Sequence, residues 1–223
     1  MLAYVLKNLI NLPKSIWFCM RVFDFKDAVR LPVLMSHNTK VRGAYKGAVR
    51  IEGPVKPGMI KYGIEGIEGV SAARRSYIRF GRSDKPRIIF TGEAYFGSGC
   101  MISVDNGQIK VGKSFSSNNN LYISCNERIE FGDDVTLGWD INFMDSDNHT
   151  VISDGKPKVG VKEIKIGNNV WIASHTDILK GAEIGDGSVL AYRSCLNKQF
   201  PKGNQLIGGY PAKVIAENTT WEI

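Results

Sequence analysis

Aliphatic residues recur at every sixth position in the C-terminal third of the chain. They are Ile166, Ile172, Ile178, Ile184, Leu190 and Leu196. A second series, mostly of small residues, lies four positions after the first five of them: Val170, Thr176, Ala182, Ser188 and Ser194. A six-residue period matches neither an α-helix nor a simple β-strand. It is a repeat signature, and a repeat of this kind predicts a stacked solenoid.

A short strand and a corner in each six-residue unit would explain both series. Three such units close one triangular turn, in which the aliphatic residue points inward and stacks on its equivalents at the ~4.8 Å spacing between strands. The second series would fill the interior near a corner. Each turn buries its inner face only against its neighbours, so stability grows with stacking and both ends need caps. The predicted fold class is therefore an all-β solenoid.

The same period extends imperfectly toward the N-terminus. It includes Phe96 and Ile102; Val111, Ser117 and Ile123; and Phe131, Leu137 and Phe143. The spacing then breaks, because Phe143 and Ile166 are 23 residues apart, five more than three six-residue units. The sequence between them is polar and contains Gly155 and Pro157, so it predicts a loop extruded from the repeat.

These patterns divide the chain into segments. We expect a helical arm or cap over 1–35 and irregular strands leading into the solenoid over 36–86. The solenoid itself is expected over 87–199, with the extruded loop at 144–163 and a C-terminal tail over 200–223.

The bulk charge is basic, with 29 Lys and Arg against 22 Asp and Glu, which gives a formal net charge of +7. This charge fits an ordinary solvated surface, or attraction to an anionic membrane or a phosphorylated ligand. No helix-turn-helix, zinc-finger or RNA-binding aromatic pattern occurs, so we expect no nucleic-acid partner. The four cysteines are widely separated, and no CxxC occurs, which predicts reduced thiols in a cytoplasmic protein: Cys19, Cys100, Cys125 and Cys195.

The first residues carry an apolar stripe at helical spacing, and no signal peptide is evident. The stripe contains Leu2, Val5, Leu6, Leu9 and Ile10. Neither this stripe nor the run Ile16–Met20 approaches the ~18 to 20 apolar residues needed to span a bilayer. Lys7, Lys14 and Arg21 flank the two runs. A helix lying in a membrane interface therefore remains open beside a helix packed on the domain or on a partner chain.

The sequence resembles the hexapeptide-repeat acyltransferases, specifically sugar O-acetyltransferases such as galactoside and maltose acetyltransferases and their polysaccharide-modifying relatives. The resemblance is strong over 109–215 and weak before residue 87. Besides the lattice it is carried by FSSNNNL at 115–121, DSDNH at 145–149, VWI at 170–172 and GGYPAKVI at 208–215. It implies a left-handed parallel β-helix, a homotrimer, acetyl-CoA lying between adjacent β-helices and an acceptor entering near the extruded loop. No metal is expected.

Transfer of acetyl to a hydroxyl needs a base, donors for the developing oxyanion and alignment of the substrates. His149 lies in the predicted loop, and the resemblance places the catalytic base there; an imidazole with a pKa near ~6.5 is mostly neutral at pH 7. Asp147 or Asp145 could fix its tautomer. Asn118 matches a residue that contacts the acceptor or the tetrahedral intermediate in the family. Solvated loop and corner residues are the alternative interpretations.

The resemblance also implies a pantetheine path along one edge of the coils, where small residues permit close approach. The predicted cofactor contacts are Trp171, Ala173, Ser174, Ala191, Tyr192, Lys198 and Lys213. The two lysines are expected to meet the phosphates of the cofactor. Tyr192 and Arg193 replace residues that are usually small in the family, and His175 is expected to be an outward-facing coil residue.

The leading prediction is an acetyl-CoA-dependent O-acetyltransferase that acts on a sugar or a cell-surface polysaccharide precursor by direct attack on the thioester. It would work in the cytoplasm, with peripheral contact at the inner face of an anionic membrane as a further hypothesis. Two alternatives remain open. One is an N-acetyltransferase acting on a nucleotide-linked amino sugar, and the other is a non-catalytic scaffold at the membrane.

Overall fold

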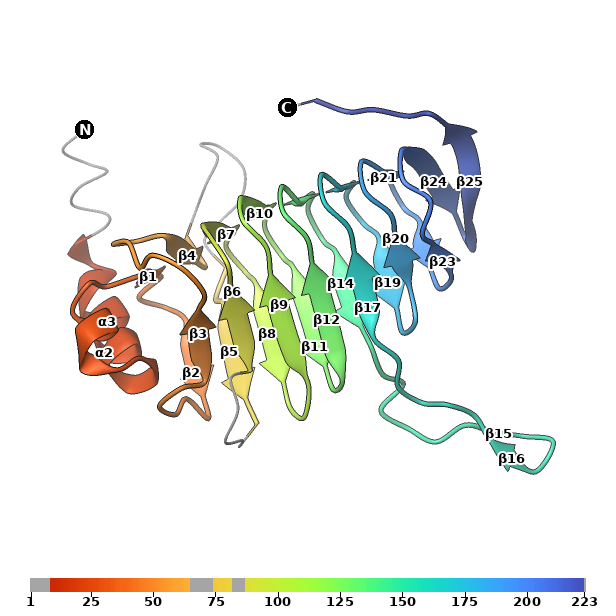
Figure 1. Ribbon diagram of the computed structural model, residues 1–223. Coiled ribbons are helices and arrows are strands. Elements are labelled where there is room, and N and C mark those ends of the chain that lie inside the picture. Colours follow the sequence, from red (N-terminus) through yellow and green to blue (C-terminus); the bar gives the residue numbers. More distant parts are fainter. Residues whose placement is uncertain (1–8, 65–73, 82–86, 223) are drawn as a thin grey trace.

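The computed structural model describes residues 9–64, 74–81 and 87–222 of the chain. The chain passes through three sheets in turn and returns to the first after every third strand, which builds a solenoid (Figure 1). We name the sheets face A, face B and face C, and the turns between them the A/B, B/C and C/A corners. The predicted all-β solenoid is confirmed. Three residues of the predicted apolar stripe, Leu2, Val5 and Leu6, lie outside the described residues.

The strands of each face stack from the N-terminal to the C-terminal end. Face A contains β1 (Val33–Met35), β4 (Ile60–Tyr62), β7 (Ala94–Phe96), β10 (Phe115–Ser117), β13 (Thr136–Leu137), β18 (Trp171–Ile172), β21 (Val189–Leu190), β24 (Gln205–Gly209) and β25 (Ala212–Glu217). Face B contains β2 (Lys40–Arg42), β5 (Tyr77–Phe80), β8 (Met101–Val104), β11 (Tyr122–Cys125), β14 (Asn142–Met144), β19 (Asp177–Leu179) and β22 (Cys195–Leu196). Face C contains β3 (Val49–Ile51), β6 (Ile88–Phe90), β9 (Gln108–Val111), β12 (Arg128–Phe131), β17 (Ile164–Ile166), β20 (Glu183–Ile184) and β23 (Gln199–Phe200).

The six lattice aliphatics fall one to a strand, from β17 to β22, and all six side chains are buried. The five residues of the second series are buried as well. The register explains the period, since Ile172 pairs with Leu137 on one side and with Leu190 on the other. Equivalent positions therefore form columns through the interior, as the sequence predicted.

The first turns of the solenoid begin much earlier than the sequence predicted. Strands β1 to β6 already pair in parallel with the later turns, so the described strands within 36–86 belong to the solenoid and do not merely lead into it. Val33 pairs with Ile60, a separation of 27 residues, whereas Ile172 and Leu190 are 18 residues apart. Long corners in the early turns hide the six-residue period, although the inward positions are still apolar.

Aromatic rings fill the middle of the solenoid. Phe96, Phe115, Phe131 and Phe143 form a continuous row in which successive ring centroids are 5.0 Å apart. Such pairs contribute about 0.5–1.5 kcal/mol beyond the burial of their area. The row runs through the turns just before the extruded loop, so the loop leaves a tightly packed part of the core.

Two helices cap the N-terminal end (Figure 1). Helix α2 (Leu12–Val22) has Pro13 in its first turn, where the missing N–H is harmless, and it is followed by the short α3 (Phe25–Ala28). Phe18, Cys19 and Val22 are buried against the first turn. The cap is also tied by hydrogen bonds, because the Ser15 hydroxyl accepts from the N–H of Met35 at 2.9 Å. No helix in the described part of the chain is long and apolar enough to cross a membrane.

The C-terminal end is closed by a hairpin and a returning tail. Strand β25 runs antiparallel to β24, and the chain then turns back along the solenoid (Figure 1). The indole Nε1 of Trp221 donates to the carbonyl of Asn169 at 2.8 Å, and its ring lies 6.2 Å from that of Trp171. The tail therefore fastens the last turn to an earlier one.

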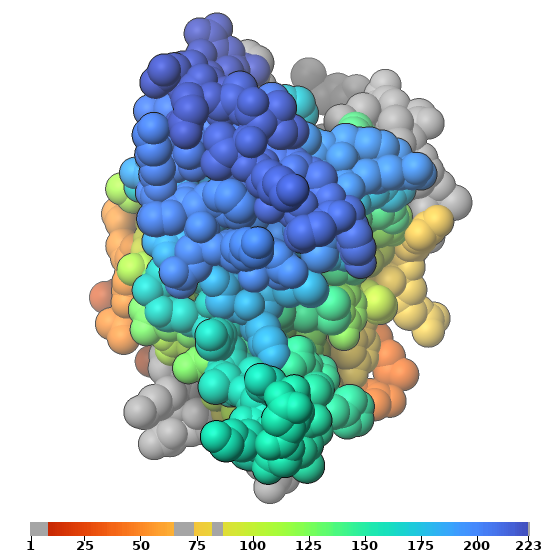
Figure 2. Space-filling view, turned by 90° about the vertical axis from the view of Figure 1, so that its right-hand side faces the viewer, coloured from red at the N-terminus to blue at the C-terminus, as the bar shows by residue number. Residues whose placement is uncertain are grey.

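The extruded loop leaves at the B/C corner. Strand β14 ends at Met144 and β17 begins at Ile164, so the break in the lattice is a real excursion of the chain. A small hairpin of β15 (Ile152–Ser153) and β16 (Lys156–Pro157) forms its tip. Seen from the C-terminal end, the loop is a separate protrusion at the edge of the molecule (Figure 2).

Candidate active site

The base of the extruded loop is fixed by a buried carboxylate. Asp145 is fully buried, and its Oδ1 accepts from the N–H of Asn126 at 2.8 Å. Its Oδ2 accepts from the N–H groups of Glu127 and Arg128 at 2.8 and 3.0 Å. The carboxylate therefore satisfies three backbone donors in the turn of the preceding coil, which would otherwise be costly to bury. Asp145 therefore holds the loop, and its carboxylate, which is bound to these donors, is not available for proton transfer.

A second anchor joins the loop to the following coil. Lys180, which comes directly after β19, forms an ion pair with Asp147 and donates to the carbonyl of Val159 at 2.9 Å. One ammonium group thus binds both limbs of the loop. The N–H of Asp147 also donates to the carbonyl of Gly160 at 2.8 Å, which closes the limbs against each other.

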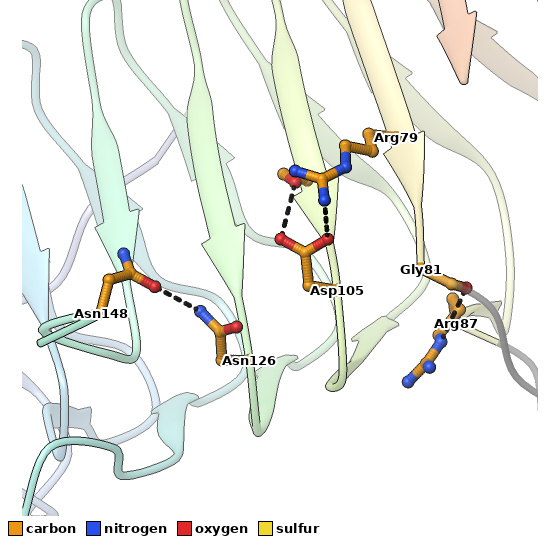
Figure 3. A network of polar contacts seen from close by, with 7 residues as sticks. Arg79, Gly81, Arg87, Asp105, Asn126 and Asn148 are labelled. Carbon is orange, nitrogen blue, oxygen red and sulfur yellow. Dashed lines mark hydrogen bonds and ion pairs between the residues drawn. The ribbon is translucent and has the colours of Figure 1, made fainter. Parts of the chain in front are cut away.

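A third anchor comes from Asn126, which lies at the B/C corner between β11 and β12. Its Nδ2 donates to Oδ1 of Asn148 at 3.1 Å (Figure 3). Asn148 has a positive φ of 57°, a conformation that Asn tolerates better than most residues. The residue immediately before the predicted base is therefore held from the neighbouring turn. The side chain of Asn126 thus helps to fix the loop.

His149 itself is exposed on the loop. Within the described ranges its imidazole forms no hydrogen bond or ion pair with the chain, and neither Asp145 nor Asp147 contacts it. The isolated chain therefore does not form the predicted pairing of His149 with one of these carboxylates. The physical reason is that three backbone donors occupy Asp145 and that Lys180 occupies Asp147.

Other predicted residues gather at the A/B corner. Asn118, Gly138, Ala173 and Ala191 each follow a strand of face A, and the register of those strands stacks them in one column. The N–H of Ala173 donates to the carbonyl of Leu190 at 2.9 Å, and the equivalent bond continues along the column. These amides are thus used between turns, and a ligand beside the column would meet small side chains and carbonyl oxygens.

Asn118 differs from the two asparagines that follow it. Asn119 is buried, and its Oδ1 accepts from the N–H of Ser98 at 2.9 Å. Asn120 has a positive φ of 64°, and its Nδ2 donates to Asp140 at 2.9 Å. The side chain of Asn118 is only half buried, and its amide forms no hydrogen bond within the described part of the chain. Of the three, Asn118 is the one whose side chain is available to a ligand.

Polar and aromatic side chains of neighbouring turns contact one another at the A/B corner. The Ser174 hydroxyl accepts from the N–H of Trp139 at 2.9 Å, so this predicted cofactor contact also supports the wall. His175 has a positive φ of 60°, and its Nε2 lies 3.9 Å from Oδ2 of Asp140. The exposed ring of Tyr192 meets His175 edge-on at 5.3 Å between centroids. His175 is thus an outward-facing corner residue, as expected.

Trp171 and the two lysines lie in three different surroundings. Trp171 is 40% exposed at the start of β18 on face A, next to the C/A corner, and the returning tail packs Trp221 on it. Lys213 lies in β25 opposite Gly208, at the end of face A that leads into the A/B corner. Lys198 lies at the B/C corner, between β22 and β23. A single chain therefore does not bring Lys198 and Lys213 together into the paired anion site that was predicted.

The predicted residues thus form two groups on different corners of the prism. Asn118, Ala173, Ser174, Ala191 and Tyr192 line the A/B corner, with Lys213 next to them, while Trp171 lies across face A toward the C/A corner. Asp145, Asp147, His149 and Lys198 lie at the B/C corner. Because a full face separates the two corners, the predicted base and the predicted cofactor path do not meet within one chain.

A groove of about 710 Å³ follows face C and the C/A corner, away from both groups. Its floor carries Lys110, Glu130, Lys165 and Glu183 as cross-strand neighbours of alternating charge. Such pairs stabilise a solvated sheet face. At the adjacent corner, the carboxylate of Asp186 accepts from the N–H of Asn168 at 2.7 Å, which is a structural role. This groove carries no chemistry of the predicted kind.

The four cysteines are all free and buried. Burial raises the pKa of the Cys19 thiol to about 11, and burial followed by the nearby Asp145 carboxylate raises the pKa of Cys125 well above its usual value. They are protonated core residues and poor nucleophiles. Among the described residues, no three His, Cys, Asp or Glu side chains are placed to hold a metal ion.

Sequence reasoning missed the anchors Lys180 and Asn126 and the cover that Trp221 forms on Trp171. Lys180 follows a lattice strand in the segment LKGA, where a lysine looks like any solvated corner residue. Only the stacking of β14 on β19 places it below the loop. Trp221 stands in a short tail without periodicity, so no local signal indicated its partner.

Comparison with known proteins gives one family and several relatives. Residues 163–198 match the family model of the bacterial transferase hexapeptide, six repeats. Galactoside O-acetyltransferase of Escherichia coli is 34% identical over 112 residues, which are 49% of this chain and 54% of that protein. An uncharacterised 24.8 kDa protein in the cps region of Klebsiella pneumoniae is 41% identical over 95 residues, 42% of each chain. The chain thus spans about half the length of these curated relatives.

The crystal structure of the polySia-specific acetyltransferase NeuO superposes with a TM-score of 0.65 at 19% identity. The match covers 86% of this chain and 76% of that one. At this identity the likeness concerns the fold. The fold is the left-handed parallel β-helix of hexapeptide repeats, as the family resemblance implied.

Proposed function

Because the chain carries the repeat of bacterial hexapeptide transferases on their left-handed β-helix, we propose that it is an acetyl-CoA-dependent O-acetyltransferase. Its acceptor would be a hydroxyl of a sugar or of a cell-surface polysaccharide precursor. The observation that carries the proposal is His149, whose imidazole is exposed and unengaged on a loop held by three separate anchors. A base needs a fixed position and a free nitrogen, and this loop offers both.

In the proposed reaction His149 accepts the proton of the acceptor hydroxyl while its oxygen attacks the acetyl carbon directly. His149 then returns the proton to the departing sulfur, so that no acyl-enzyme forms. Acetyl-CoA supplies the activated thioester. The Asn118 amide is free to donate a hydrogen bond to the oxyanion or to a hydroxyl of the acceptor, and such a donor contributes most when preorganised. Ala173 and Ala191 leave room beside Asn118 for a narrow chain such as pantetheine.

The separation of the two residue groups supports an oligomer. A complete site requires the A/B corner of one copy to face the B/C loop of another. Two different patches then meet, which is a heterologous contact, and a heterologous contact forms a ring when its rotation closes. A prism with three corners closes most simply with three copies, so the proposed assembly is a homotrimer. Lys198 and Lys213 would then approach each other from different copies.

The proposed location is the cytoplasm, where acetyl-CoA and sugar precursors meet, with peripheral contact at the inner membrane face. Four buried, protonated thiols agree with a reducing compartment.

The proposal is tested by measuring CoA release with a panel of sugar hydroxyl and amino-sugar acceptors, together with calorimetric binding of CoA. We expect acetylation of hydroxyls and a ~10²- to 10⁴-fold loss of rate in His149→Ala with CoA binding retained. His37→Ala is the matched control, because His37 lies at the opposite end of the solenoid, before β2. Preference for amines would favour the N-acetyltransferase, and the absence of CoA binding would favour the scaffold.

A further inference from the structure

The outer side of the N-terminal cap carries an apolar surface. Residues of α2 and α3 and the turns beside them leave large apolar side chains in solvent, with Trp17 47% and Phe25 71% exposed. We name this surface the terminal patch, and it consists of Ile10, Ile16, Trp17, Met20, Phe25 and Val29. Ile16, Trp17 and Met20 share the outer face of α2, and large exposed apolar surfaces usually mark a contact with a partner or a membrane.

Capping of the solenoid does not require the terminal patch. The opposite side of α2 does that work, with Phe18, Cys19 and Val22 buried and the Phe18 ring 6.4 Å from that of Phe80. A cap that only closed the first turn would expose polar residues on its outer side, as terminal caps of solenoids do. The apolar outer side therefore serves something else.

Basic residues outnumber acidic residues in the segment that carries the terminal patch. Over 10–30 the chain has four basic residues, Lys14, Arg21, Lys26 and Arg30, against the two acidic residues Asp24 and Asp27. The ammonium of Lys14 lies 4.6 Å from the centre of the Trp17 ring, so charge and aromatic surface are presented together. Arg21 donates to the carbonyl of Ala44 at 2.9 Å and helps to hold α2 in place. The outer side of the cap thus combines apolar, aromatic and positive groups.

We infer that the terminal patch docks the protein on an anionic lipid bilayer, with α2 and α3 lying in the membrane interface. Apolar side chains would enter the boundary between headgroups and acyl chains, and Trp is favoured at that depth. Lys14, Lys26 and Arg30 would meet the lipid phosphates, each adding to the attraction. A protein partner would also fit an apolar face, but the net positive charge of this segment is complementary to an anionic lipid surface.

The place of the cap fixes the orientation of the docked protein. The terminal patch lies at one end of the solenoid, and the C-terminal hairpin closes the other (Figure 1). In the proposed trimer, on which this step rests, the three solenoids run side by side and present three patches to one plane. Three weak contacts on one rigid body then bind far more tightly than one. The extruded loops would face sideways above the membrane, within reach of a lipid-linked glycan.

Vesicle flotation of the full-length protein tests the inference. Wild type should float with vesicles of equal parts phosphatidylcholine and phosphatidylglycerol, and should stay behind with phosphatidylcholine alone or at high salt. Ile16→Ser/Trp17→Ser should bind at least about tenfold more weakly through loss of apolar contact. Lys26→Glu/Arg30→Glu should also bind at least about tenfold more weakly, because each basic residue contributes about fivefold.

Two controls match these variants. Ile215→Ser removes an exposed apolar residue from the opposite end, and Lys156→Glu/Lys158→Glu makes the same change of net charge on the extruded loop. Both should float like wild type, and circular dichroism verifies that every variant is folded. If wild type does not float, or if the controls lose binding equally, the inference is wrong.

Size-exclusion chromatography of the same variants tests whether the terminal patch instead binds a second copy of the chain. If Ile16→Ser/Trp17→Ser lowers the number of copies in the assembly and wild type does not float, the terminal patch is a contact between copies and membrane docking is refuted. Flotation needs no acetyl acceptor, so its failure is separate from failure of the proposed activity.

Discussion

The coiled wall and the extruded loop are built in opposite ways. In the wall, each inward side chain is buried between equivalents on both sides, and the strand amides are used from turn to turn. In the loop, Ile152 and Val159 are exposed, and the chain is fixed by three anchors near its base. Stability therefore resides in repetition, whereas the chemistry we propose depends on a few unrepeated contacts.

The largest difference in stability between the wall and the loop is expected when a cavity is made in the wall. Phe143→Ala removes the last ring of the aromatic row and should lower the free energy of unfolding by about 3–5 kcal/mol. Guanidinium denaturation measures the change. Ile152→Ala at the loop tip is the matched control and should change stability by less than about 0.5 kcal/mol. Equal losses at the two sites would show that the loop is part of the cooperative core.

Asp145 lies where the two regions join. Asp145→Ala leaves three backbone N–H groups without an acceptor, and we expect it to lower the free energy of unfolding by about 1–3 kcal/mol. Asp145→Asn keeps an acceptor oxygen and should lose less. Because both variants weaken the anchor that holds the extruded loop, the acetylation rate should fall in both. The affinity for CoA, which we assign to the A/B corner, should be unchanged. Loss of CoA affinity instead would indicate a wider collapse of the wall.

A substitution of Lys180 should change the position of His149 without changing the stability of the fold. Its ion pair with Asp147 is partly exposed, and such pairs contribute about 0–1 kcal/mol. Lys180→Met should therefore leave thermal unfolding nearly unchanged and lower kcat through a mobile His149, with the pH profile of the rate retained. Lys165→Met, on face C, is the control and should alter neither quantity. A large loss of thermal stability in Lys180→Met would contradict this assignment.

The smallest effect is expected for the natural thiols. Burial raises the pKa of Cys19 to about 11 and that of Cys100 to about 12, so both remain protonated at pH 8.5, where an unfolded thiol is about half ionised. The folded protein should react slowly with a disulfide reagent at that pH. In Ile152→Cys, one added thiol on the loop should react at the rate of a free cysteine. Rapid reaction of the natural thiols would mean that the wall opens easily.

The sequence predicts the late turns because their corners have a constant length, so that Ile166 to Leu196 keep a strict period. It does not predict the early turns, since Val33 and Ile60 occupy equivalent places one full turn apart, and the three corners of that turn differ in length. The number of residues between equivalent positions depends on the length of the corners as well as on the length of the strands. A solenoid whose corners vary loses its signature while keeping its interior.

The site was predicted only in part for a similar reason. The break after Phe143 located the loop and His149, because an interruption is visible along the chain. The task of Asp145 depends on amides of Asn126 to Arg128 in another turn, and that of Lys180 depends on the stacking of β14 on β19. These contacts arise between turns, where a single sequence without register carries no information.

The reversed direction of β25 decides where the molecule stops. Each turn of a parallel solenoid offers its edge to the next, and the first turn of another molecule could continue the same sheets. β25 covers the edge of β24 with a strand of opposite polarity and carries Lys213 and Glu217 on its exposed side, while α2 covers the first turn. Charged residues on an edge oppose further pairing. On face A, the C-terminal edge is thereby closed to the first turn of another copy, which opposes end-to-end growth into fibres.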